Sequence, residues 1–408
     1  MDSLKKLILK YGNPDALIDH WGHQSDRFAV WGFDEVFMYN HQGCYLNNNK
    51  IDGDPLELCN SILNTWDDDS SYPYALGYIS YDFKNDLFSH LKLKEPNNQN
   101  FIWFGKPKII EKYSIRNSMD VHSIKDIQAL QLKKEIPPMN DYKKSIEKIK
   151  LYLKLGETYQ INYSNPREYT YNGCPFDLYL HLSNMAQPKN GFYLDSGNYK
   201  FLSISPEKFF EVKNNIIKTY PIKGTANRSD DKSKDKEFYN QLKNSQKDRA
   251  EHLMIVDLLR NDLGKISKFG TVKTNNLYNI QSFESIHHME SEICGELNDN
   301  MTFQDIIKAL FPGGSITGAP KERSIEIIDE LENYSRQLYT GTMGYLSKNN
   351  YMNFNIAIRT LSFYDNNIIY PVGGGIVWDS KALLEREEAV SKGKILTDFI
   401  NQQIGKNV

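Results

Sequence analysis

The sequence has little cysteine and no long apolar run. Its four cysteines, among 408 residues, are scattered and form no CxxC pair, so zinc ribbons and redox dithiols have no support. No stretch approaches the roughly 18 apolar residues that a membrane-spanning helix needs. Lysines interrupt the apolar N-terminal segment, which disfavours a signal peptide. These absences predict a soluble cytoplasmic protein with no membrane partner.

The sequence also lacks an excess of charge of either sign. Its 49 Lys and Arg against 52 Asp and Glu give a formal net charge of −3. Proteins that grip nucleic-acid phosphates usually carry a basic excess, so a nucleic-acid partner is not expected. Hydrophobic residues make up 40% and charged residues 25%, which is typical of globular domains and excludes wholesale disorder.

Common nucleotide and zinc motifs are missing as well. Gly313 and Gly318 have the separation of the glycines in a P-loop, but Ala319 stands where that motif needs lysine. The glycines at 373–375 lack GxGxxG spacing, and there is no HExxH or GxSxG. Binding of nucleotides by these routes is therefore excluded.

Strand and helix patterns follow one another irregularly. A segment at 133–141 with two consecutive prolines marks a boundary. It separates an N-terminal lobe (1–135) from a catalytic domain (136–408). A tight turn is expected at 214–215, a surface loop at 228–237, and helices at 247–266 and 383–403. Without regular βαβ alternation, the pattern predicts an α+β fold.

Two glutamates on predicted helices are candidate metal ligands, because an unpaired carboxylate is costly to bury. Glu251 shares a face with apolar residues, and it either pairs with Arg249 or Arg260 or holds a metal. Glu388 and Lys392 share a face of the last helix. They form either an exposed ion pair, or a site in which Glu388 faces Glu251 across Mg²⁺.

Other segments supply candidate nucleophiles and anion-binding groups. Lys223, at a strand end, is either a surface lysine or a desolvated nucleophile. Ser315 and the glycines at 373–375 lie in turns that suit carboxylate recognition. Arg359 offers a bidentate fork for a carboxylate.

Taken together, these segments resemble the chorismate-utilising enzymes from about residue 138 to 397. That resemblance implies antiparallel sheets packed in a sandwich with helices outside. The matching blocks occur in the family's order; they are GETYQIN, SISPEKFF, PIKGT, DRAEHLMIVDLLRNDLGKI, SIHHMESEICGEL, FPGGSITGAPKERSIEII, YTGTMGYLS, NFNIAIRTL, GGGIVWDS and EREEAVSKGK.

Two positions indicate the reaction. Lys223 in PIKGT resembles aminodeoxychorismate synthase component I, whereas anthranilate synthases carry alanine there. Gln160 stands where isochorismate and salicylate synthases place a general-base lysine, so water is disfavoured as the nucleophile. The resemblance implies amination of chorismate to 4-amino-4-deoxychorismate, for 4-aminobenzoate and folate biosynthesis. Anthranilate synthase component I is the alternative, and a catalytically silent chorismate-binding subunit is a third.

The resemblance also implies roles for individual residues. Glu251 and Glu388 would hold Mg²⁺, with Asp248 and Glu385 in support. Glu207 would protonate the departing C4 hydroxyl while Lys223 attacks C2, and ammonia would then add at C4. His288 is implied as a further catalytic residue near the ring. The implied substrate-binding residues are Gln160, Ser315, Tyr339, Arg359, Gly373, Gly374, Gly375 and Lys392.

Ammonia implies a partner. At neutral pH it is mostly ammonium, which is not a nucleophile, and the family uses a glutamine amidotransferase subunit that delivers ammonia internally. The cysteines of this chain have no glutaminase-like setting. A separate glutaminase subunit is therefore expected.

Overall fold

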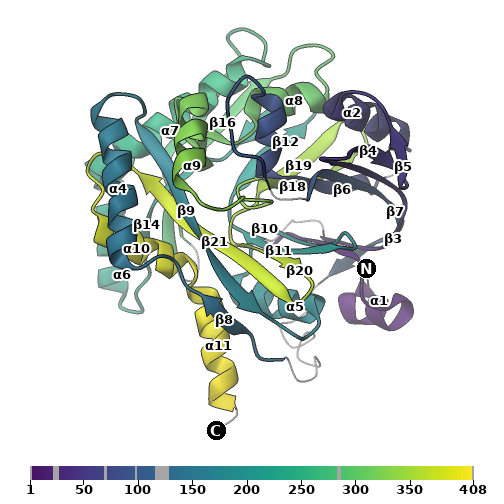
Figure 1. Ribbon diagram of the computed structural model, residues 1–408, viewed down its shortest axis with the longest axis horizontal. Helices are drawn as coiled ribbons and strands as arrows, with labels where there is room; N and C mark the ends of the chain where they lie inside the picture. Colours follow the sequence, from purple (N-terminus) through teal and green to yellow (C-terminus); the bar gives the residue numbers. More distant parts are fainter. Residues whose placement is uncertain are drawn as a thin grey trace.

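The fold combines helices with one connected network of β-strands. A computed structural model describes residues 2–21, 27–68, 71–96, 99–114, 128–282 and 286–406. Figure 1 shows the arrangement and its labels. The helices are α1 (Leu4–Tyr11), α2 (Pro55–Trp66), α3 (Lys84–Leu87), α4 (Met139–Lys154), α5 (Pro175–Ala186), α6 (Lys232–Asn244), α7 (Gln246–Gly264), α8 (Phe303–Leu310), α9 (Lys321–Leu331), α10 (Ala382–Lys392) and α11 (Lys394–Lys406), with the 3₁₀ turns η1 (Tyr81–Phe83) and η3 (Gly314–Ile316).

The strands pair almost wholly antiparallel, and only β1 runs parallel to its partner β7 among the described pairs. They are β1 (Asp2–Ser3), β2 (Ala16–Asp19), β3 (Arg27–Asn40), β4 (Gly43–Leu46), β5 (Asn49–Ile51), β6 (Pro73–Ile79), β7 (Asn100–Ser114), β8 (Gln131–Lys134), β9 (Gln160–Thr170), β10 (Asn190–Asp195), β11 (Tyr199–Ser205), β12 (Lys208–Lys213), β13 (Ile216–Thr219), β14 (Ile222–Asn227), β15 (Lys273–Ser282), β16 (Ile286–Glu296), β17 (Gly318–Ala319), β18 (Thr342–Ser347), β19 (Tyr351–Ile356), β20 (Thr360–Tyr364) and β21 (Asn367–Ile376).

Alternation of side chains along the strands builds a sandwich. On β2, Ala16 and Ile18 face a core made almost wholly of strand residues, whereas Leu17 faces a second core beneath α1, α5 and α11. On β6, Leu76 faces the strand core and Ala75 a third core beneath α2, α7 and α8. Two sheets therefore meet face to face with helices outside, because successive strand residues point to opposite faces. The predicted α+β sandwich is confirmed.

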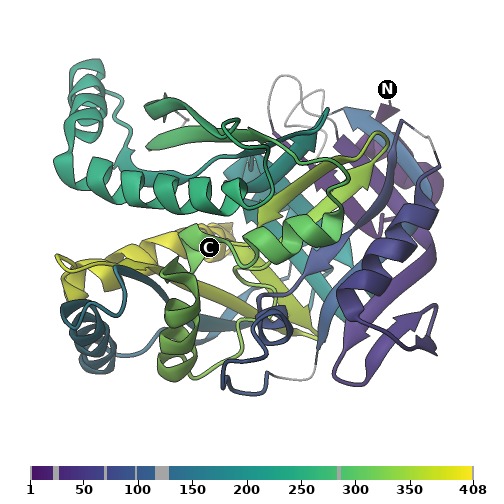
Figure 2. The ribbon, with the colours of Figure 1, turned by 90° about the horizontal axis from the view of Figure 1, so that it is seen from above.

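Strands from the first 135 residues pair directly with later ones. Strand β2 pairs with β10, and β6 pairs with β18. Figure 2 shows the purple and blue N-terminal elements against green strands from the C-terminal part. The N-terminal strands thus complete sheets that the rest of the chain begins.

Local predictions met mixed outcomes. The turn at Asn214 and Asn215 is confirmed, since both residues have positive φ (52° and 61°) and join β12 to β13. The predicted loop at 228–237 is partly wrong. Helix α6 starts at Lys232, because the Asp231 carboxylate accepts hydrogen bonds from the first-turn N–H groups of Ser233 and Lys234.

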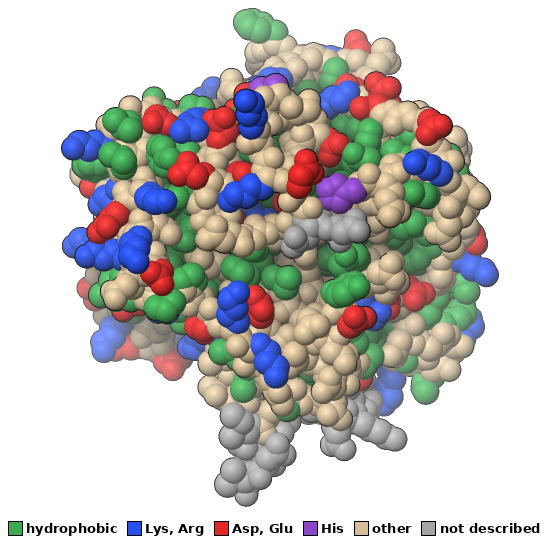
Figure 3. All heavy atoms as spheres, in the orientation of Figure 1, with side chains coloured by type: hydrophobic (Ala, Val, Ile, Leu, Met, Phe, Trp, Pro, Cys, Tyr) green, Lys and Arg blue, Asp and Glu red, His purple; other side chains and the backbone are tan. Residues whose placement is uncertain are grey.

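The predicted single helix at 383–403 is also wrong, since it divides at Gly393 into α10 and α11. A Cβ on Gly393 would lie 2.2 Å from Nη1 of Arg167, so a side chain there would displace the arginine. In the part of the chain that is described, no helix is both long and apolar enough to cross a bilayer. Figure 3 shows acidic and basic side chains interspersed over one face of the molecule.

We predict that Asp231→Ala destabilises the start of α6 by about 1 kcal/mol, because two first-turn N–H groups lose their acceptor. Native-state hydrogen exchange should show several-fold faster exchange in the first turn of α6. The neighbouring Asp230→Ala serves as the matched control. Unchanged exchange in Asp231→Ala would contradict the capping role.

Candidate active site

Lys223 reaches into the molecule from β14. This strand pairs with β16, which sets Lys223 opposite Met289. The lysine is partly buried, and this burial lowers the pKa of its amine. The carboxylates of Glu251 and Glu388 oppose this effect and raise the pKa. The structure therefore does not support the alternative of an exposed surface lysine.

Glu207 is a buried carboxyl near this amine. It precedes β12, is 8% exposed, and accepts a hydrogen bond of 3.0 Å from Oγ of Ser315 in η3. Burial raises the pKa of Glu207 to about 7, although the Ser315 hydrogen bond and the charge of Lys223 act to lower it. A carboxyl with this pKa holds a proton through part of the neutral range.

The glycines of β21 allow close approach of charged groups. Strand β21 pairs with β9, so that Gly373 lies opposite Ser164 and Gly375 opposite Asn162. A Cβ on Gly375 would lie 2.8 Å from Nζ of Lys223, and one on Gly374 would lie 3.3 Å from Nζ of Lys392. A Cβ on Gly373 would clash at 2.2 Å with the carbonyl oxygen of Tyr163. Side chains at Gly374 and Gly375 would crowd the two amines, and one at Gly373 would clash with the backbone of β9.

Gln160 begins β9 beside the same amine. A Cβ on Gly375 would lie 3.2 Å from its Nε2 atom. The side chain is fully buried, and within the described residues neither atom of its amide has a hydrogen-bond partner. Burying an unpaired amide is costly, so this group is suited to meet a bound ligand.

Helix α10 contributes two carboxylates and a lysine. Oε1 of Glu388 lies 2.7 Å from Nζ of Lys392, so the two side chains form an ion pair, which was one of the two alternatives for this helix face. Nζ of Lys392 also donates a 2.8 Å hydrogen bond to the Gly373 carbonyl. Burial alone would raise the pKa of Glu388, but Lys392, Lys223 and Lys247 together lower it. Burial and the charge of Glu388 raise the pKa of Glu385, although Ser380 and the charges of Lys247 and Lys392 act to lower it.

Glu251 projects from α7 toward the same region. Its partner is Lys247, at 3.8 Å and one helical turn earlier. The predicted pairing with Arg249 or Arg260 is wrong: the Arg249 guanidinium lies 4.4 Å from the centre of the Tyr278 ring, and Arg260 pairs with Asp257.

The α7 and α10 carboxylates converge on one amine. The charge of Lys247 on α7 lowers the pKa of Glu385 and Glu388 on α10, and Glu251 and Glu388 both act on Lys223. Figure 2 shows α7, in teal, and α10, in yellow, on two sides of the same part of the molecule.

The donor chemistry of these carboxylates fits Mg²⁺. Asp248 packs against Gly224, the residue that follows Lys223. A Cβ on Gly224 would be 3.1 Å from Cβ of Asp248. Among the described residues, no three acidic, histidine or cysteine side chains lie close enough to enclose an ion alone. Mg²⁺ commonly takes one or two protein carboxylates and completes its shell with water and substrate oxygens. Glu251 and Glu388 are carboxylates of this kind, and both act on the charge of Lys223.

His288 is buried on β16 and lies beside Glu290. Its Nε2 atom lies 3.5 Å from Oε2 of Glu290, which also pairs with Lys189 at 3.4 Å. The charge of Glu290 contributes to the raised pKa of Glu207. Sequence reasoning missed Glu290 and Lys247. Lys247 was detectable from its i, i+4 spacing to Glu251, whereas Glu290 gave no comparable signal.

The structure ties Tyr339 and Arg359 to neighbouring segments rather than to the Lys223 cluster. Tyr339 is buried, and its ring centre lies 5.9 Å from the guanidinium of Arg336. The backbone carbonyl of Arg359, which has a positive φ of 49°, accepts a hydrogen bond from Ile204. The charge of Arg359 lowers the pKa of Tyr370 on β21, which places it near that strand.

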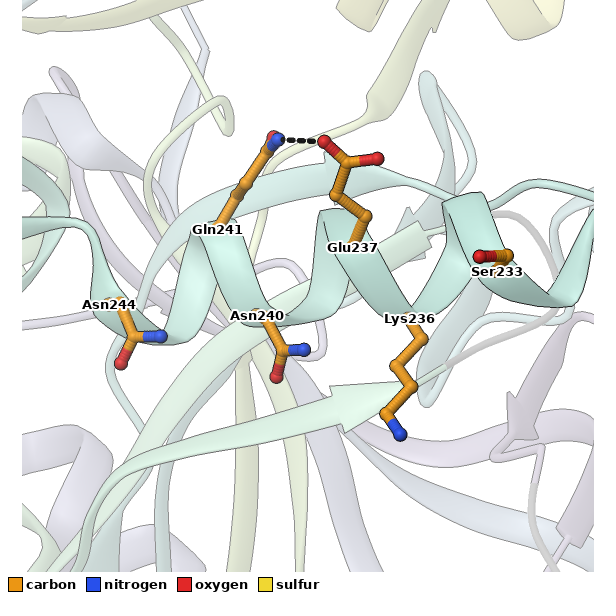
Figure 4. Close-up of a pocket in the computed structure, with 6 residues that line it drawn as sticks. All are labelled: Ser233, Lys236, Glu237, Asn240, Gln241 and Asn244. Carbon is orange, nitrogen blue, oxygen red and sulfur yellow. Dashed lines mark hydrogen bonds between the residues drawn. The ribbon is translucent and has the colours of Figure 1, made fainter.

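A surface hollow of about 550 Å³ along α6 is separate from this cluster. Figure 4 shows its lining on one exposed helix face, with a 2.9 Å hydrogen bond from Gln241 to Glu237. It contains none of the predicted site residues. The six lining residues are Ser233, Lys236, Glu237, Asn240, Gln241 and Asn244.

The chain is similar to known proteins over much of its length. The chain is 41% identical to aminodeoxychorismate synthase component 1 of Escherichia coli over 251 residues, which cover 62% of this chain and 55% of that protein. It is 31% identical to the Bacillus subtilis protein of the same name over 380 residues, which cover 84% and 81% of the two chains. The chain thus spans about half the length of the Escherichia coli relative that it matches.

A solved structure gives the same picture for the fold. The crystal structure of anthranilate synthase component I from Streptococcus pneumoniae TIGR4 matches with a TM-score of 0.80 and 26% identity. The match covers 92% of this chain and 93% of that one. The model of the chorismate binding enzyme family matches residues 16–398. The chain therefore belongs to the chorismate binding enzyme family.

Proposed function

We propose that the protein is aminodeoxychorismate synthase component I, which adds ammonia to chorismate and forms 4-amino-4-deoxychorismate. The main support for this proposal is the partly buried Lys223 amine, which feels the charges of Glu251 and Glu388 and lies with the Gln160 amide against Gly375. A water-adding enzyme needs a base to activate water. The neutral amide of Gln160 is no such base, whereas an amine of lowered pKa is a competent nucleophile.

Glu207 supplies the proton in this reaction. Hydroxide is a poor leaving group, so the C4 hydroxyl of chorismate must leave as water. A carboxyl with a pKa of about 7 is protonated in part of the population at neutral pH and still acidic enough to donate. The hydrogen bond from Ser315 to Oε1 orients the carboxyl.

Lys223 forms the covalent intermediate. Its neutral nitrogen attacks C2, the ring double bonds shift, and the C4–O bond breaks as Glu207 delivers its proton. Ammonia then forms the C4–N bond, the double bonds shift back, and the C2–N bond to Lys223 breaks. The proton lost by the new amine returns the carboxylate of Glu207 to its acid form.

The remaining residues hold the substrate. Mg²⁺, held by Glu251 and Glu388 with Asp248 and Glu385 nearby, would neutralise the ring carboxylate of chorismate. Gln160, Lys392 and the unhindered backbone at 373–375 line the space around the amine. Tyr339 and Arg359 would meet the enolpyruvyl carboxylate, and His288 would lie near the ring.

We further propose that a separate glutaminase subunit supplies ammonia and that the reaction takes place in the cytoplasm. The rival function is that of anthranilate synthase component I, which releases pyruvate and forms anthranilate. The match to a solved anthranilate synthase favours that rival as the second candidate.

We predict that Lys223→Ala abolishes formation of 4-amino-4-deoxychorismate. The chain is incubated with chorismate, Mg²⁺ and ammonium at alkaline pH, and the product is converted to 4-aminobenzoate by an added lyase. The exposed Lys213→Ala is the matched control and should keep full activity. Full activity of Lys223→Ala would remove its nucleophilic role, and anthranilate with pyruvate from the unmodified chain would overturn the proposed function.

We predict that Glu207→Gln slows the first turnover by about 10²–10⁴-fold, because proton donation is lost. In the unmodified chain, first-turnover chorismate consumption should fall as the pH rises through about 7, where Glu207 loses its proton. Ser315→Ala should move this fall to higher pH, since the Ser315 hydrogen bond lowers the pKa of Glu207. A pH profile unchanged in both variants would contradict the assignment.

We predict that Glu251→Gln and Glu388→Gln each raise the Mg²⁺ concentration needed for half-maximal activity by about tenfold or more, because each variant removes a charged oxygen ligand. Glu237→Gln, in the hollow along α6, is the control and should leave the titration unchanged. A Mg²⁺ titration that superimposes on the original for both variants would exclude these carboxylates as ligands.

A further inference from the structure

Arg336 is a buried cation whose hydrogen bonds are fully used. Its side chain is 3% exposed, and Nε and Nη2 donate to the two carboxylate oxygens of Glu332 at 2.8 and 2.7 Å. Nη2 also donates to the Asn162 carbonyl at 2.6 Å, and Nη1 donates to the Ile316 carbonyl and to Oγ1 of Thr340, both at 3.1 Å. Every N–H of the guanidinium therefore has an acceptor.

Those acceptors lie on three segments that carry proposed substrate-binding residues. Asn162 is two residues from Gln160 on β9, Ile316 follows Ser315 in η3, and Thr340 follows Tyr339. Glu332 extends the same junction, because its Oε1 atom accepts 2.8 Å hydrogen bonds from the backbone N–H and the hydroxyl of Ser164. Ser164 in turn pairs with Gly373 on β21.

A residue from the N-terminal part of the chain, Asp82, forms a hydrogen bond with Gln337, the residue after Arg336. Oδ2 of Asp82, in η1, accepts 2.9 Å from the backbone N–H of Gln337 and 2.8 Å from Nε2 of Gln99. The Tyr81 ring centre lies 4.7 Å from the Arg336 guanidinium, within cation–π range. The junction thus connects the first 135 residues to the segments around the site.

We infer that Arg336 is a positioning residue for chorismate binding: with Glu332, it fixes β9, η3 and the Tyr339 segment in one arrangement, supported by Asp82 from the N-terminal part. This inference rests on the proposed function for its catalytic consequence and on family membership for its effect on binding. Arg336 does not itself touch the Lys223 cluster; it sets the spacing of residues that line it. Displacements of about 1 Å in such a frame cost up to about 10²-fold in rate.

Lysine cannot replace this arginine. Its single ammonium keeps the charge but cannot reach acceptors that surround a planar fork. Arg336→Lys should therefore weaken chorismate binding about tenfold or more and lower kcat/KM at least as much. Arg323→Lys is the matched control, because Arg323 also donates to two carboxylates from α9 but is 36% exposed. It should stay within about twofold of the original.

Two more conservative substitutions, both at Thr340, keep the inference testable if Arg336→Lys fails to fold. Thr340→Val removes one acceptor of Arg336 with little change in shape, and Thr340→Ser keeps the hydroxyl. We expect Thr340→Val to weaken chorismate binding several-fold and Thr340→Ser to restore it. Equilibrium binding of chorismate with Mg²⁺ is measured for each purified variant, together with the thermal unfolding midpoint and the first-turnover pH profile.

The outcomes separate positioning from stability alone. A positioning role weakens binding per folded molecule and shifts the pH profile set by Glu207. Lower unfolding midpoints with unchanged binding and an unchanged profile would overturn the inference. Failure of the unmodified chain to aminate chorismate would refute the proposed function instead, and the binding measurements would then still decide the role of Arg336.

Discussion

The site depends on burying an amine and a carboxyl together. In water Lys223 would be charged and Glu207 ionised, and neither would serve as nucleophile or acid. Removal from solvent favours the neutral form of both groups, so the pKa of the amine falls and that of Glu207 rises to about 7. The carboxylates of Glu251 and Glu388 limit the fall for Lys223. The environment therefore moves both groups toward the forms in which amine attack and proton donation occur at the same pH.

The geometry of the strands makes this arrangement possible. Glycines at 373–375 on β21 leave room for two lysine amines where any side chain would collide with them or with β9. The ladder of β21 and β9 sets Gly375 opposite Asn162 and so brings Gln160 to the amine. Helices α7 and α10 bring the carboxylates from either side. Behind this layer, the Arg336 and Glu332 pair joins segments that are distant in sequence, with Asp82 supporting it from the N-terminal part.

Sequence reasoning found the features that depend on local pattern or on family resemblance. The sandwich and the turn at Asn214 follow from alternation and turn chemistry, and the structure brings most of the predicted site residues around Lys223. Features set by distant contacts escaped it. Glu290, which acts on Glu207 from β16, and the approach of Arg167 to Gly393 are two such features. The Lys247 partner of Glu251 is local, four residues away, and was overlooked. Arg336 was missed because most of its acceptors are backbone carbonyls and a hydroxyl on other segments, which leave no signature in spacing.

The most direct test of the central claim is mass spectrometry of the chain quenched during reaction with chorismate and Mg²⁺ in the absence of ammonia. A nucleophilic Lys223 predicts an adduct of chorismate less one water on the peptide that contains this residue, because the C4 hydroxyl leaves as water when the C2–N bond forms. Adding ammonia should discharge the adduct. Turnover of chorismate with no adduct on Lys223, or with the adduct on another residue, would contradict the account.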